Sequence, residues 1–101
     1  MERNFRTDLK VNNVPVELNP FVDEFLTRTV IGAVSSLKGV ENIHNLELYL
    51  EQGDVQLVVN GNELPLTPFA KEIITNTIIG LVSPLKGADK IDSLKINIRA
   101  E

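Results

Sequence analysis

The sequence predicts an α+β fold in which one strand–strand–helix–strand unit is used twice in tandem. Moving the chain along itself by 48 positions aligns residues 11–46 with residues 59–94 without a gap, and 17 of these 36 positions are identical. Apolar alternation flanks a long amphipathic segment in both copies. A repeat of this length defines the folding unit. We therefore expect a single domain over residues 1–101, made of two repeats (about 5–52 and 53–101) that share one core, because one unit alone is too small to bury its helix.

Each repeat begins with two strands joined by a tight turn. Residues 5–12 and residues 53–60 alternate between apolar and polar side chains, as strands with one buried face do. The residues that follow tolerate the positive φ of a two-residue hairpin. The second strands are short, and Pro15 and Pro65 fall in them. Because proline cannot donate a ladder hydrogen bond, we expect these to be edge strands. The turn residues are Asn12-Asn13 and Asn60-Gly61.

A long helix follows in each repeat. Asn19 and Thr67 are typical N-cap residues, and each precedes a proline that suits the first helical position. Gly39 and Gly87 are typical helix terminators, although Pro84 predicts an earlier end for the second helix. The apolar arc of each helix covers more than half of its circumference, whereas a helix lying on a sheet needs only about 100°. The surplus apolar surface must therefore be covered by something.

A third strand ends each repeat, over residues 46–51 and 94–99. Leucine or isoleucine points inward at alternate positions, and the outward positions are mainly polar or charged. Glu47 and Glu51 correspond to Lys95 and Arg99 in the other repeat, so these pairs would attract if the two strands were neighbours. Such cross-strand pairs contribute a few tenths of a kcal/mol, up to ~1. We predict two helices on one face of a mainly antiparallel six-stranded sheet with pseudo-twofold symmetry, the other face being polar.

Two adjacent positions in the middle of each helix are candidates for an interface. Ile31 and Ile79 lie well outside the main apolar arc. Gly32 and Gly80 follow them, and a glycine inside a helix costs about 1 kcal/mol relative to alanine. The recurring glycines indicate either a close backbone approach, such as a crossing of the two helices, or retention from a common ancestor. We predict that these four residues lie at an interface between copies of the chain.

The sequence offers few candidates for catalysis or metal binding. His44 is the only histidine and falls in a loop, where it has no second ligand or nucleophile beside it. Glu41, Asp89 and Asp92 lack the dense oxygen spacing of a calcium loop. The recurring threonines have no base in register, so a hydroxyl nucleophile is unsupported. We expect no enzymatic activity, no cofactor and no metal site. These threonines are Thr27, Thr29, Thr75 and Thr77.

Binding of nucleic acid or membranes is not expected either. Tyr49 stands on the outward sheet face between Glu47 and Glu51, which makes a poor platform for stacking bases. The net charge is −4, and general nucleic-acid binders need clustered cations. The first ten residues lack the apolar segment of a signal peptide, and no apolar run is long enough to span a membrane. The chain also lacks cysteine. These features favour a cytoplasmic protein.

These exclusions favour a non-enzymatic interaction or scaffold module that self-associates, with a second copy or another protein as its partner. The alternative is a small-molecule-binding or regulatory module with a site at the repeat junction. Nothing in the sequence names the ligand or the partner.

Three short motifs together resemble small uncharacterised prokaryotic proteins, of archaeal type, that consist of one such unit. They are Asn60-Gly61, Leu18-Asn19-Pro20-Phe21 and Ser35-Ser36-Leu37-Lys38-Gly39. The resemblance implies that this chain is a fused form of a unit that elsewhere pairs as a homodimer, and it carries over no functional residue. The cradle-loop barrels are also built from two strand–strand–helix–strand units, with shorter helices. A pseudo-symmetric six-stranded barrel with crossover helices is therefore the alternative fold.

Overall fold

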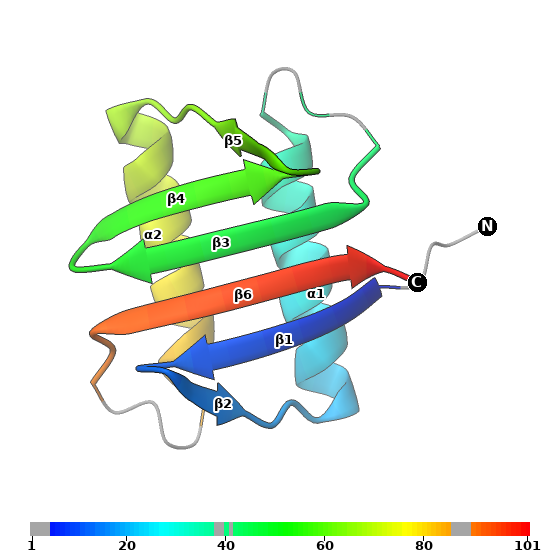
Figure 1. Ribbon diagram of the computed structural model, residues 1–101. Helices are drawn as coiled ribbons and strands as arrows, with labels where there is room; N and C mark the ends of the chain where they lie inside the picture. Colours follow the sequence, from blue (N-terminus) through cyan, green and yellow to red (C-terminus); the bar gives the residue numbers. More distant parts are fainter. Residues whose placement is uncertain (1–4, 38–39, 41, 86–89) are drawn as a thin grey trace.

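The computed structural model describes residues 5–37, 40, 42–85 and 90–101, and it shows two helices on one face of a six-stranded antiparallel sheet (Figure 1). The α+β prediction with a tandem strand–strand–helix–strand unit is confirmed. In chain order the elements are β1 (Phe5–Val11), β2 (Val14–Val16), α1 (Pro20–Ser35), β3 (Asn45–Glu51), β4 (Asp54–Val59), β5 (Asn62–Leu64), α2 (Pro68–Val82) and β6 (Ser93–Ala100).

The sheet is open and has the strand order β2-β1-β6-β3-β4-β5. The barrel alternative is therefore wrong, because β2 and β5 are free edges that do not pair with each other. The third strand of each repeat lies beside the first strand of the other repeat, since β6 pairs with β1 and β3 pairs with β4. At the centre, Leu48 lies opposite Ile96, its equivalent in the repeat. The internal pseudo-twofold axis thus passes between these two residues.

The two short strands are edge strands, as the sequence predicts. Pro15 lies within β2, opposite Lys10. Pro65 lies just beyond β5, which ends at Leu64, so its predicted place inside the strand is wrong. The register of the second hairpin explains this difference, because the pairing of β5 with β4 starts at Asn62 and ends at Leu64. A proline at the first position after an edge strand removes no ladder hydrogen bond.

The helix starts agree with the predicted caps. The Asn19 side chain accepts a hydrogen bond from the Val22 N–H at 2.8 Å, and the Thr67 hydroxyl accepts one from the Ala70 N–H at 3.2 Å. Such caps satisfy N–H groups that have no partner within the helix. Helix α2 ends at Val82, before Pro84 as expected. Gly39 and Gly87, the predicted terminators, lie outside the described residues.

The core lies between the helices and the inner sheet face, and it draws on both repeats. The predicted inward side chains of β3 and β6 are buried, with at most 4% of their surface exposed. Each helix packs against these side chains through one stripe of buried residues. This stripe follows the helical spacing of i, i+4 and i+8, which places three side chains over the sheet. The stripe residues are Leu26, Val30 and Val34 on α1, and Ile74, Ile78 and Val82 on α2.

The predicted charge pairs between the two third strands do not form as proposed. Lys95 lies opposite Tyr49, and Glu51 lies opposite Ser93. Arg99 instead approaches Asp8 of β1, with 3.9 Å between its Nη2 and the carboxylate. The antiparallel register explains the error, because equivalent residues face each other only on the twofold axis, and every other equivalent pair is separated along the strands.

Two turn asparagines fasten the loops that lead into the third strands. Asn60 has a φ of 52°, and its side-chain oxygen accepts hydrogen bonds from the N–H groups of His44 and Asn45 at 2.8 and 3.0 Å. Its amide group donates to the Asn42 carbonyl at 3.0 Å. Asn12 has the same φ and forms the equivalent three bonds to Lys90, Asp92 and Ser93. The predicted positive-φ turns are therefore confirmed.

Candidate interaction surface on the helix layer

Four large apolar side chains are exposed on the helices. Phe21 and Phe69 are 73% and 71% exposed, and Phe25 and Ile73 are 49% and 48% exposed. Phe69 is the equivalent of Phe21 in the repeat, and Ile73 is the equivalent of Phe25. The same apolar pair is therefore presented twice, once at the start of each helix.

These side chains lie on the helix surface that faces away from the sheet. At 100° per residue, Phe21, Phe25 and Gly32 fall within an arc of ~40° that is roughly opposite the buried stripe. Phe69, Ile73 and Gly80 occupy the same arc of α2. We call these six residues the outer ridges. Since a single axis relates α1 to α2, both outer ridges lie on the same side of the molecule.

The α1 ridge is held in place by a contact within the helix. The rings of Phe21 and Phe25 lie one helical turn apart, with centroids separated by 5.8 Å and planes tilted by 57°. Aromatic rings at i and i+4 on a helix stabilise each other in such tilted geometry. Beside them, Glu24 and Arg28 form an exposed ion pair at 3.7 Å. The ridge therefore presents ordered aromatic rings next to a charged border.

A shallow apolar hollow separates the start of α1 from the end of α2. The two helices run in opposite directions (Figure 1), so the ridge rings of one lie beside the last turns of the other. The hollow has a volume of about 210 Å³, which is below the ~300–1,000 Å³ of small-molecule pockets. Its walls are almost wholly apolar. The lining residues are Phe21, Val22, Phe25, Leu26, Gly80, Leu81, Pro84 and Leu85.

The mid-helix glycines are exposed, and the described part of the chain does not crowd them. A Cβ placed on Gly32 or Gly80 would meet no described atom within 4 Å. The interpretation that the two helices cross at these glycines is therefore wrong. Gly80 instead forms part of the hollow, where its missing side chain leaves space. Ile31 and Ile79 are half-buried and pack against the core, on the flank of each helix. The assignment of these four residues to an interface stays a prediction.

On the outward sheet face, Tyr49 is held by contacts within the chain. The Tyr49 hydroxyl donates a hydrogen bond to the Glu47 carboxylate at 2.8 Å, and the Lys95 ammonium lies 5.4 Å from the centroid of the Tyr49 ring. The hydrogen bond to Glu47, with partial burial and the charge of Glu47 as smaller causes, raises the pKa of Tyr49 above its ordinary value. Both the hydroxyl and one ring face of this tyrosine are thus engaged within the chain.

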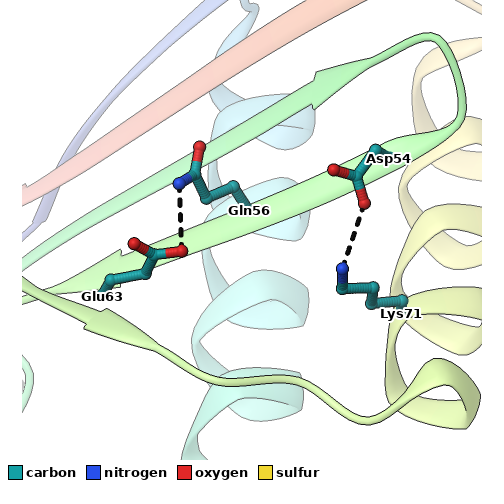
Figure 2. Close-up of polar contacts among 4 residues, drawn as sticks. All are labelled: Asp54, Gln56, Glu63 and Lys71. Atoms are coloured by element: carbon teal, nitrogen blue, oxygen red, sulfur yellow. Dashed lines mark hydrogen bonds and ion pairs between the residues drawn. The ribbon is translucent and has the colours of Figure 1, made fainter.

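Polar contacts at the β4–β5 edge have a structural role. Figure 2 shows the Lys71 ammonium of α2 3.1 Å from the Asp54 carboxylate, and the Gln56 amide donating to Glu63 at 3.0 Å. They tie the first turn of α2 and the edge strand β5 to β4. Their side chains are exposed, so these contacts contribute little to stability.

The first repeat differs at the positions equivalent to Asp54 and Lys71. Arg6 and Asp23 carry the reverse charges there. Asp23 accepts a hydrogen bond from the Thr27 hydroxyl at 3.3 Å, and Thr27 is also hydrogen-bonded to Thr7 of β1. Both threonines are buried. Thr27 therefore joins α1 to the sheet, and this contact pattern is that of a core hydroxyl.

His44 and Asp92 are the loop candidates that the structure describes, and both are exposed. His44 is exposed, and its carbonyl accepts a hydrogen bond from the Ala100 N–H at 2.8 Å, so its backbone helps to join β3 to β6. Asp92 is exposed beside Asn12, while Glu41 and Asp89 lie outside the described residues. In the part of the chain that the structure describes, no three acidic or histidine side chains are grouped to hold a metal ion. Neither described helix is long and apolar enough to cross a membrane.

No protein-family model, curated protein or solved structure matches this chain. The resemblance to single-unit prokaryotic proteins therefore stays an expectation from the three short motifs.

Proposed function

We propose that the protein is a non-enzymatic interaction module that self-associates through the outer surface of its helix layer. The observation that supports this most is the exposure of the outer ridges, where Phe21 and Phe69 each leave more than two-thirds of their surface in solvent. Large exposed apolar patches bordered by polar residues mark sites of protein association. Exposed aromatic side chains are also enriched in such contacts.

The chemistry of the surface fits a protein partner better than a substrate. The ridges bring together apolar side chains and two glycines, and none of these has an ionisable group. The Glu24–Arg28 pair lies at the border of the patch and not inside it. An apolar centre with a charged rim is the usual composition of a protein interface, and it supplies no acid, base or nucleophile.

Sedimentation velocity over a range of protein concentrations tests this proposal. The wild-type chain is expected to sediment as a larger species as its concentration rises. The double variant Phe21→Ser/Phe69→Ser is expected to stay monomeric, because the most exposed ring of each ridge is removed. Circular dichroism of the variant should match that of the wild type, since both rings lie outside the core.

Val14→Ser is the matched control. Val14 is 62% exposed, but it lies on the edge strand β2, away from the helix layer. This variant should associate like the wild type, which separates the ridges from apolar exposure in general. A wild-type chain that remains monomeric at every concentration, or a Phe21→Ser/Phe69→Ser variant that associates normally, contradicts the proposal.

A further inference from the structure

We infer that self-association stops at a closed pair, in which the helix layers of two copies face each other and an aromatic ring of one copy enters the hollow over Gly80 of the other. This inference rests on the proposed function and adds the stoichiometry and the contact. The internal twofold axis runs through the sheet between Leu48 and Ile96, so it places both ridges on one side. A single partner laid on that side covers both of them.

A molecule with two equivalent association surfaces that point in different directions would assemble into an open filament. Each copy that binds would leave one surface free for the next copy. A molecule whose two surfaces lie on one side closes after one partner has bound. Among the described residues, the outward face of the sheet carries no comparable apolar ridge, because its side chains are mainly polar and charged. The geometry therefore favours a pair with twofold symmetry, in which each ridge contacts the partner.

The exposed area fits a pair of moderate affinity. With 150–250 Å² per buried aromatic side chain, the exposed parts of Phe21, Phe25, Phe69 and Ile73 add up to roughly 450 Å² in one copy. Two copies would bury about twice that area from these side chains alone, close to the ~1,000 Å² that a specific interface needs. Pairs at this lower limit are usually transient, so we expect a dissociation constant in the micromolar range.

The glycines supply an independent argument for a close partner. Glycine inside a helix is unfavourable, and no described atom of the chain approaches Gly32 or Gly80 closely enough to require it. Both glycines lie in line with the exposed rings. The hollow of about 210 Å³ beside Gly80 is bordered by apolar side chains. An exposed aromatic ring on one copy and the hollow beside Gly80 on the other are complementary surfaces. Contacts of this kind close an isologous interface.

Sedimentation equilibrium with the full chain tests both the stoichiometry and the contact. The wild type is expected to reach two copies and no more as the concentration rises through the micromolar range. Two variants each remove one ridge, Phe21→Ser/Phe25→Ser on α1 and Phe69→Ser/Ile73→Ser on α2. Because each ridge contacts the partner in the closed pair, either variant should raise the dissociation constant at least tenfold.

Gly80→Ala distinguishes loss of the interface from loss of folding. Alanine favours the helix, and its Cβ meets no atom of the described residues within 4 Å, so the melting temperature of the dilute protein should rise by about 4–8 °C. The added methyl group enters the hollow, so the dissociation constant should rise several-fold. Val14→Ser again serves as the control with an unchanged dissociation constant.

The outcomes separate the inference from the function on which it rests. A wild type that stays monomeric overturns the proposed self-association, and the closed pair with it, in favour of a different protein as partner. Growth beyond two copies, or a one-ridge variant that still pairs normally, leaves self-association in place and overturns the closed pair. A Gly80→Ala variant that is more stable but pairs with unchanged affinity overturns the hollow as a contact.

Discussion

Replacing Asn60 with alanine tests how the turn asparagines hold the loop ahead of each third strand. The wild-type side chain forms three hydrogen bonds to backbone groups of residues 42, 44 and 45. Its backbone also has a φ of 52°, a conformation that asparagine tolerates better than alanine does. Alanine therefore removes the bonds and adds a backbone cost.

Each hydrogen bond contributes about 0.5–1.5 kcal/mol net. Because these bonds are exposed and water can replace part of them, we take the lower half of that range, which amounts to ~2 kcal/mol for three bonds. Alanine in a left-handed conformation costs a further ~1 kcal/mol. Asn60→Ala should therefore lower the free energy of unfolding by ~3 kcal/mol, which corresponds to a melting temperature lower by at least ~12 °C.

Urea unfolding followed by circular dichroism measures this loss. Asn60→Gly separates the two terms, because glycine loses the hydrogen bonds but accepts the positive φ, and it should cost ~2 kcal/mol. Asn12→Ala should match Asn60→Ala, and the double variant should be additive, since the two turns lie at opposite ends of the sheet (Figure 1). Asn76→Ala, an exposed position on α2, is the control.

Two results would contradict this role of the Asn60 side chain. A loss below ~0.5 kcal/mol for Asn60→Ala would mean that water fully replaces the side-chain bonds. A glycine variant as unstable as the alanine variant would mean that the left-handed backbone carries no cost at this position.

Three further predictions concern the sheet and its edge. Glu47→Ala should lower the pKa of Tyr49 toward its ordinary value, and because Tyr49 is the only tyrosine and tryptophan is absent, ultraviolet absorbance of the phenolate reads it directly. Because the pKa of Tyr49 is raised in the folded state, the protonated phenol stabilises the fold at pH values below the ordinary tyrosine pKa. This stabilisation is lost as the pH rises through the folded-state pKa. In urea unfolding, the free energy of unfolding should therefore fall more steeply at alkaline pH for the wild type than for the variant. Ile96→Ala, at a fully buried central position, should cost ~4 kcal/mol in urea unfolding, and a loss under ~1.5 kcal/mol would contradict the packing. Lys71→Met breaks the exposed pair with Asp54 and should change stability by less than ~0.5 kcal/mol, so a thermal-unfolding loss above ~1.5 kcal/mol would show that the pair does more than tie the edge.

Most of the strands, turns and helix starts could be predicted from the sequence, because each depends on residues that are close together along the chain. Alternation identified the inward faces of β3 and β6, and every residue assigned to those faces is buried. The residue types Asn19 and Thr67 predicted the helix starts, and Asn60-Gly61 predicted a turn of positive φ. Each of these rules depends on a few neighbouring residues.

The candidate surface was located only in part. The wide apolar arc predicted a surplus on each helix, but the residues proposed for it, Ile31 and Ile79, turn out to be half-buried. The most exposed part of that surplus is Phe21 and its equivalent, Phe69. The sequence does not show which part of the wide apolar arc faces the sheet, because Phe21 is as apolar as Leu26. The rotation of α1 is decided by how Leu26, Val30 and Val34 fit over the sheet. The buried stripe of α2 decides the rotation of that helix in the same way.

The duplicated unit, its strands, turns and helix starts, and the inward face of each strand all follow from local patterns in the sequence. Three features depend on the complete fold. Each repeat's last strand pairs with the other repeat's first strand, Lys95 lies opposite Tyr49 and not Glu47, and the rings of Phe21 and Phe69 stay in solvent. Strand pairing and helix rotation depend on all the elements at once, because a register or a rotation is stable only when the whole core closes around it.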